Sequence, residues 1–141
     1  MTFRYNDINV NINVKGEGEP LFLLHGWGCT GDIFKDIQAV LSTCYRTYSF
    51  DFPGFGASDE PTTVWGVEEY TRMVEQFAKE NGITKPALMG HSFGGRVSIV
   101  YASRNEVSRV VLVDAAGIKP KRPLKYYWKV YTFKAMKWLC N

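Results

Sequence analysis

Ser92 lies at the centre of residues 90–94, Gly-His-Ser-Phe-Gly, and its hydroxyl is a candidate nucleophile. A short apolar run precedes this segment, and a helical pattern follows from Arg96. A serine turned sharply between a strand and a helix has a strained backbone that exposes its hydroxyl above the sheet edge. The backbone can pass only if the residues two before and two after are small, as Gly90 and Gly94 are. The spacing predicts a nucleophilic serine, against the alternative of a plain glycine-rich turn.

Two backbone amides are candidates to stabilise an oxyanion beside Ser92. The helix after the serine directs free N–H groups and the positive end of its dipole toward the same point, which makes the Phe93 amide one donor. Residues 25–28, His-Gly-Trp-Gly, follow another apolar run. A tight turn at His25 and Gly26 would point the next amide, that of Trp27, inward. We therefore expect Trp27 and Phe93 to form an oxyanion hole, with His25 bracing the loop.

The elements that must position these residues are visible as alternating strand and helix patterns. Short apolar runs alternate with amphipathic stretches, which is typical of a mostly parallel sheet covered by helices on both faces and connected by right-handed crossovers. The sequence thus predicts an α/β fold. The expected elements are a hairpin over 3–14, strands at 21–24, 46–50, 86–89 and 109–113, and helices at 32–43, 67–80 and 96–103.

Three segments together resemble a known family. Residues 25–28, residues 51–58 (Asp-Phe-Pro-Gly-Phe-Gly-Ala-Ser) and residues 90–95 (Gly-His-Ser-Phe-Gly-Gly) are similar in order and spacing to the N-terminal half of the α/β-hydrolase superfamily. The resemblance is to its esterase, haloperoxidase and C–C hydrolase group. It implies an α/β-hydrolase fold over residues 1–118, with Ser92 as nucleophile. It also implies a helical cap that begins after the strand at 109–113, followed by two further strands that bear an acid and a histidine.

The family's catalytic triad runs in the chain order Ser, acid, His. The two histidines of this sequence, His25 and His91, both precede Ser92. We therefore expect these 141 residues to be truncated and to lack the general base. Asp114 ends a predicted strand and is a candidate triad acid, although a structural or pocket-lining role at the entrance to the cap is the stronger expectation.

The expected function is that of a serine hydrolase acting on carboxylic ester-like acyl substrates. One alternative is a non-catalytic remnant or binding module that keeps the pocket without turnover. A further alternative is a dinucleotide-binding domain, because Gly26, Gly28 and Gly31 follow a strand and Asp51 stands 20 residues after the last glycine. That alternative leaves the serine turn unexplained and puts the bulky Trp27 where a pyrophosphate would lie. We instead expect Asp51 to make structural hydrogen bonds.

Composition limits the remaining possibilities. With 45% hydrophobic and 22% charged residues, the sequence is typical of a globular protein, and no stretch approaches the 18 apolar residues of a membrane span. The cysteines are odd in number and lack metal-ligand spacing, which favours reduced thiols in the cytoplasm. We expect no cofactor, no metal and no nucleic-acid partner. The three cysteines are Cys29, Cys44 and Cys140.

Residues 119–141 differ in charge from the rest, with seven basic residues and no acidic ones. Seven of their apolar side chains share one face of a helical wheel over 124–139, which predicts a basic amphipathic helix. We expect this helix to begin the cap rather than to bind an anionic membrane. An unpaired edge at the strand 109–113 would favour self-association or a complementing C-terminal chain. The predicted face consists of Leu124, Tyr127, Trp128, Tyr131, Ala135, Trp138 and Leu139.

Overall fold

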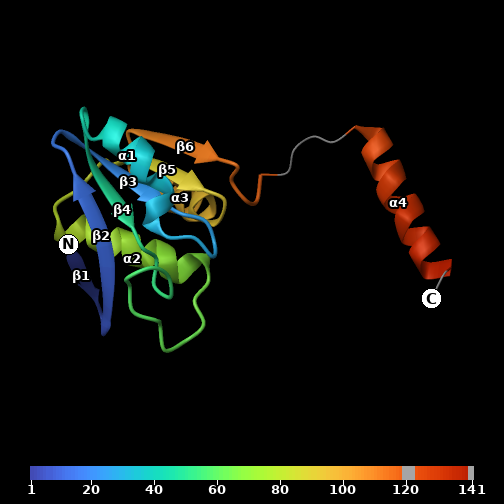
Figure 1. The fold of residues 1–141 in the computed structure, drawn as a ribbon, viewed down its shortest axis with the longest axis horizontal. Coiled ribbons are helices and arrows are strands. Elements are labelled where there is room, and N and C mark those ends of the chain that lie inside the picture. The colour runs from blue at the N-terminus through green and yellow to red at the C-terminus, as the bar shows by residue number, and fades with distance from the viewer. Residues whose placement is uncertain (119–122, 140–141) are drawn as a thin grey trace.

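The computed structural model describes residues 1–118 and 123–139 and contains one sheet with helices on both of its faces (Figure 1). The strands alternate with helices from β3 onward, as the sequence predicts. The elements are β1 (Thr2–Tyr5), β2 (Ile8–Lys15), β3 (Glu19–Leu24), the 3-10 turn η1 (Gly31–Phe34), α1 (Lys35–Leu41), β4 (Tyr45–Phe50), α2 (Val67–Glu80), β5 (Ala87–His91), α3 (Phe93–Arg104), β6 (Arg109–Val113) and α4 (Leu124–Leu139).

The six strands lie in the order β1-β2-β4-β3-β5-β6. The pairs β1–β2 and β2–β4 are antiparallel, whereas β4, β3, β5 and β6 are mutually parallel. Because β3 and β5 are neighbours, Leu24 pairs with Gly90 and the loops that follow the two strands leave the same sheet edge. The topology thus brings the loop at residues 25–28 beside Ser92.

Strand alternation divides the core between the two faces of the sheet. On β3, Phe22 and Leu24 belong to the larger cluster, which includes side chains of α2 and α3, such as Phe77. Leu21 and Leu23 belong to a smaller cluster on the opposite face, together with Phe34 of η1. The central strand is therefore covered on both faces, as a buried parallel strand requires.

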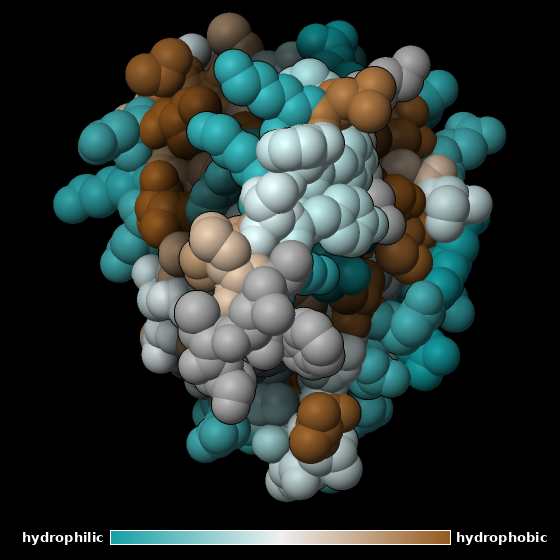
Figure 2. Space-filling view, turned by 90° about the vertical axis from the view of Figure 1, so that its right-hand side faces the viewer, coloured by the Kyte–Doolittle hydropathy of each residue, from teal (hydrophilic) through white to brown (hydrophobic). Residues whose placement is uncertain are grey.

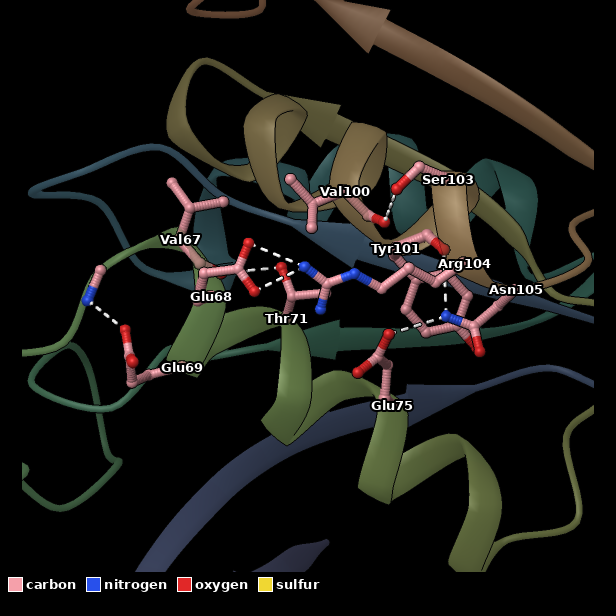
Figure 3. A network of polar contacts seen from close by, with 11 residues as sticks. Val67, Glu68, Glu69, Thr71, Glu75, Val100, Tyr101, Ser103, Arg104 and Asn105 are labelled. Atoms are coloured by element: carbon pink, nitrogen blue, oxygen red, sulfur yellow. Dashed lines mark hydrogen bonds and ion pairs between the residues drawn. The ribbon is translucent and has the colours of Figure 1, made fainter.

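Polar contacts tie α2 to α3 on the outer side of the larger cluster (Figure 3). Arg104 donates hydrogen bonds to both carboxylate oxygens of Glu68, and Asn105 donates to Glu75 at 2.8 Å. Burial, and secondarily the negative charge of Glu75, raises the pKa of Tyr101 to about 12. These contacts join the C-terminal end of α3 to α2.

The fold class expected from the sequence is confirmed, and most elements lie within a residue or two of their expected bounds. Two helices differ. The helix expected at 32–43 begins with the 3-10 turn η1, in which the Gly31 amide donates to Asp51 Oδ1 at 2.7 Å. The helix expected to start at Arg96 begins at Phe93, immediately after the serine.

The strand β6 forms one edge of the sheet, and α4 follows it in the chain. Val111 and Val113 on β6 are 41% and 43% exposed. In α4 the Trp128 and Tyr131 side chains are 74% and 66% exposed, so they are not packed beneath another element. Figure 2, which faces the α4 end of the molecule, shows hydrophilic and hydrophobic side chains interspersed. Within the described part of the chain, no helix is long and apolar enough to cross a membrane.

Part of the predicted tail segment lies outside the described residues. This applies to residues 119–122 and 140–141, and to the side chains of Ala135, Lys137, Trp138 and Leu139. The helix expected over 124–139 is present as α4. Its assignment as the beginning of a cap stays a prediction.

Candidate active site

Ser92 connects β5 directly to α3 and has a strained backbone. Its φ of 47° and ψ of −108° lie outside the regions that L-residues ordinarily occupy. Such strain persists only where the surroundings hold it, and it concentrates at functional sites. Two hydrogen bonds hold the Ser92 backbone in this conformation. The Ser92 amide donates to the Val113 carbonyl at 3.1 Å, and the Ala116 amide donates to the Ser92 carbonyl at 3.0 Å.

Glycines allow the chain to pass closely around Ser92. A Cβ atom at Gly94 would meet the carbonyl oxygen of Leu24, and one at Gly90 would lie 2.5 Å from the Gly94 carbonyl oxygen. A Cβ at Gly26 would lie 3.1 Å from the Ser92 Cβ. The loop after β3 is therefore in direct contact with the serine, and three glycines make this approach possible.

The loop after β3 orients the Trp27 amide. Residues 26–29 form a turn in which the Cys29 amide donates to the Gly26 carbonyl at 3.1 Å, and Gly28 has a φ of +76°. A turn of this kind requires a positive φ at its third residue, which glycine adopts without strain. Among the described residues, neither the Trp27 amide nor the Phe93 amide donates a hydrogen bond. Both amides are thus available as the donors of an oxyanion hole.

His25 is fully buried and both of its ring nitrogens are engaged. The Phe52 amide donates to His25 Nε2 at 2.9 Å, which makes Nε2 an acceptor. Nδ1 must then carry the proton and donate to the Gly26 carbonyl oxygen, 2.7 Å away. His25 therefore braces the loop after β3 against the loop after β4, and neither nitrogen is free to take a proton from Ser92.

Burial lowers the pKa of His25 below its usual 6.5, although the Gly26 hydrogen bond and the charge of Asp51 act in the opposite direction. As the pH falls below about 6.5, the unfolded chain takes up this proton before the folded chain does. The free energy of unfolding should therefore be highest above pH 6.5 and fall until the pH passes the folded pKa. Thermal melts between pH 8 and pH 5 check this expectation. A His25→Gln variant should show a shallower decline, and an equally steep one would contradict it.

The Asp51 carboxylate accepts hydrogen bonds from three residues that are distant from one another in the chain. Burial alone would raise the pKa of its carboxyl group, but hydrogen bonds from the Ala57 amide, the Asn11 side chain and the Gly31 amide outweigh burial and lower it. Because both carboxylate oxygens already accept these bonds, Asp51 is not free to bind a ribose. This geometry argues against a dinucleotide site at residues 26–31.

His91 and Asp114 lie beside Ser92 in the fold. Among the described residues, no hydrogen bond joins either side chain to the Ser92 side chain. The His91 ring packs against Gly26, and its buried Nδ1 has no hydrogen-bond partner among the described residues. Asp114 directly follows β6, is exposed and has a φ of 44°. Its role as triad acid stays a prediction.

An aromatic cluster that pattern analysis does not indicate surrounds the loop after β3. The Trp27 ring lies 5.4 Å from the Phe93 ring and 5.1 Å from the Phe55 ring, centroid to centroid. Tyr70 of α2 lies 5.3 Å from Phe93 and 5.2 Å from Trp65. These residues come from separate segments, so neither spacing nor periodicity places them together in the sequence.

One cavity is remote from this site. It encloses about 840 Å³ and is lined by residues near the C-terminal ends of α2 and α3, including Lys79, Arg104 and Glu106. Since α3 has 12 residues, at about 1.5 Å per residue its two ends are roughly 18 Å apart. That cavity is therefore not part of the arrangement around Ser92. A second cleft of about 480 Å³ is lined in part by Trp27 and lies beside the site.

Three features together define a class of protein. They are a strained serine between a strand and a helix, a facing loop with a free amide, and this order of strands. The family model described as alpha/beta hydrolase fold matches residues 19–133. The chain belongs to the α/β-hydrolase fold family.

Relatives of several activities share this half of the fold. The chain is 30% identical over 125 residues to a 1-acylglycerol-3-phosphate O-acyltransferase of Arabidopsis thaliana, covering 79% of this chain and 29% of the relative. It is 32% identical to a pimeloyl-[acyl-carrier protein] methyl ester esterase of Aliivibrio fischeri, covering 75% and 44%. The crystal structure of a bacterial membrane phospholipase A is similar with a TM-score of 0.81 and 26% identity, covering 94% and 44%. The chain spans less than half the length of each.

Proposed function

We propose that this chain carries the nucleophile and the oxyanion hole of a serine hydrolase that acts on carboxylic ester-like acyl substrates. The observation that supports the proposal best is the strained Ser92 backbone, which is held between β5 and α3. The loop at residues 25–28, which we call the oxyanion loop, contacts this serine through Gly26. The Ser92 hydroxyl oxygen attacks the acyl carbon. The amides of Trp27 and Phe93 then stabilise the negative charge that develops on the carbonyl oxygen. The alcohol leaves, and water releases the acyl group from the serine.

The general base of this reaction comes, in our proposal, from outside the 141 residues. His25 supports this because both its ring nitrogens are engaged, and burial lowers its pKa. His91 supports it because its buried Nδ1 makes no hydrogen bond to Ser92 or to any other described residue. The exposed valines of β6 offer an edge where a segment bearing an acid and a histidine could pair. A second copy of this chain is the alternative partner for that edge.

Three further expectations belong to the same proposal. The substrate is a small acyl compound, and α4 begins a helical cap over the site. Cys29 and Cys44 are free thiols in the structure, in keeping with the cytoplasmic location that we propose. The esterase among the relatives supports the choice of an ester over other acyl compounds.

Chemical rescue with an external base tests the assignment of Ser92. Imidazole should supply the missing base and make hydrolysis of p-nitrophenyl acetate depend on Ser92. We expect the rate with imidazole to exceed the sum of the rates with chain alone and with imidazole alone, and the excess to vanish in Ser92→Ala. Release of p-nitrophenolate is the measurement.

A matched variant controls for non-specific effects of the substitution. Ser103→Ala removes a hydroxyl from the other end of α3, where Ser103 Oγ donates to the Val100 carbonyl at 2.7 Å. The excess rate should survive this change. An excess that also survives Ser92→Ala would refute the assignment of Ser92 as nucleophile.

A further inference from the structure

We propose that the cleft beside Trp27 is a binding subsite for the uncharged alkyl or aryl group of the substrate. This inference rests on the proposed function and adds the chemical class of the group that the enzyme selects. The cleft is an open groove of about 480 Å³ between the loop after β3, the loop after β4 and the start of α2. The apolar and aromatic side chains among its lining residues are Trp27, Pro53, Phe55, Pro61, Val64, Trp65 and Tyr70.

The cleft adjoins the candidate active site at Trp27. The amide of this residue is one proposed oxyanion donor, whereas its side chain lines the cleft. Its ring packs against Phe93, the residue that follows the nucleophile, and against Phe55 on the opposite wall. A substrate whose carbonyl oxygen reaches the two amides can therefore extend an attached group past Trp27 into the cleft.

The inner walls of the cleft are held in place before any ligand binds. The Tyr70 hydroxyl donates to the Pro53 carbonyl at 2.9 Å, which fixes the loop after β4 to α2. The Gly54 amide donates to the Asp59 carbonyl at 3.0 Å and closes this loop. Trp65 packs edge-on against Tyr70, with an interplanar angle of 74°. Since the aromatic walls are preformed, binding need not order them first, which favours affinity.

The chemistry of the lining favours an uncharged apolar group. Glu60 is the single charged side chain among the described residues of the lining, and it is exposed. The volume lies within the range of roughly 300–1,000 Å³ of pockets that bind small organic molecules. Trp27 is 62% exposed, and covering such a ring with an alkyl or aryl group removes apolar surface from water.

Binding of unreactive amides tests the subsite independently of catalysis. N-methyl alkanamides extend the acyl side, and N-alkyl acetamides extend the leaving-group side. We expect Kd, measured by isothermal titration calorimetry with the full chain, to fall about fourfold for each added methylene in one of the two series. The series that responds identifies which side of the scissile bond occupies the cleft. No dependence on length in either series would overturn the proposal.

Variants assign this dependence to the cleft. Trp65→Ser should abolish most of it, whereas Val40→Ser, at a 68% exposed position on α1 outside the cleft lining, should leave it unchanged. Because Trp65 also packs against Tyr5, a second variant is needed in case the first is unstable. Val64 lines the rim and is 99% exposed, so Val64→Asp should fold normally and weaken binding of the longest amide several-fold. Length dependence that persists in both variants would contradict the subsite.

The outcome is separable from that of the proposed function. Ser92 does not line the cleft, so Ser92→Ala should bind the amides with unchanged length dependence. Length-dependent binding without Ser92-dependent hydrolysis would leave the subsite standing and refute the hydrolase. Ser92-dependent hydrolysis together with amide binding that does not depend on length would support the hydrolase and refute the subsite.

Discussion

Substituting Gly94 by alanine should destabilise the protein by about 3 kcal/mol, even though alanine is the better helix former. Alanine gains roughly 1 kcal/mol over glycine from helix propensity. Against this gain, the added Cβ would meet the Leu24 carbonyl oxygen and lie 2.6 Å from that of His25. Both obstacles are backbone atoms, one at the end of β3 and one in the loop that follows, and they cannot rotate away. We expect the Tm to fall by roughly 10 °C, which a calorimetric or circular dichroism melt would measure.

The matched control adds a Cβ where the backbone leaves room. Gly66 precedes α2 with a φ of −108°, and a Cβ there would meet Glu69 Oε2 at 3.4 Å, which is ordinary contact with a flexible side chain. Gly66→Ser also introduces a hydroxyl at a helix N-cap, a position that favours serine. Its Tm should be unchanged or slightly raised. If Gly94→Ala melts at the same temperature as the wild type, Gly94 does not lie as close to the Leu24 and His25 carbonyl oxygens as the structure shows.

Local pattern was sufficient for the elements whose sequence signals agree. The helix α2 has the bounds predicted over 67–80, because an amphipathic stretch ends in Asn81-Gly82 and nothing competes with it. The start of α3 was predicted three residues late. Gly94 and Gly95 are poor helix formers, yet packing against β3 and the contact of Gly95 with Ala115 require small residues there. Tertiary packing outweighs propensity at this position.

The site could be predicted only as far as it depends on chain order. The positions of Ser92 and of the loop at residues 25–28 follow from strand ends that share one edge of the sheet. The bracing role of His25 depends on the hydrogen bond from the Phe52 amide to His25 Nε2. These two residues are 27 apart in the chain, so sequence spacing does not reveal the contact. The aromatic cleft likewise combines the loop after β3, the loop after β4 and α2, and no periodicity spans those segments.

Adding a C-terminal segment that carries an acid and a histidine should raise the esterase rate of this chain by about 10²–10⁴-fold, the usual contribution of general acid–base catalysis. Without a base, the oxyanion hole and substrate binding alone should give at most ~10³–10⁴-fold acceleration over water. In that state Ser92→Ala should change little, because an unactivated hydroxyl is a weak nucleophile. Initial rates on a p-nitrophenyl acyl ester, with and without the added segment, measure both effects.

Two variants make the gain specific to the proposed mechanism. After addition of the segment, Ser92→Ala should abolish the increase, and replacing the segment's histidine by alanine should abolish it as well. Pairing of the segment should also protect the β6 amides from hydrogen exchange, since β6 is now an edge strand with Val111 and Val113 exposed.

Full Ser92-dependent turnover by the isolated chain would contradict the assignment of the base to an external segment. It would point instead to His91 or to a second copy of the chain. A folded complex that shows protection at β6 but no rate increase would favour a binding module that keeps the elbow without turnover.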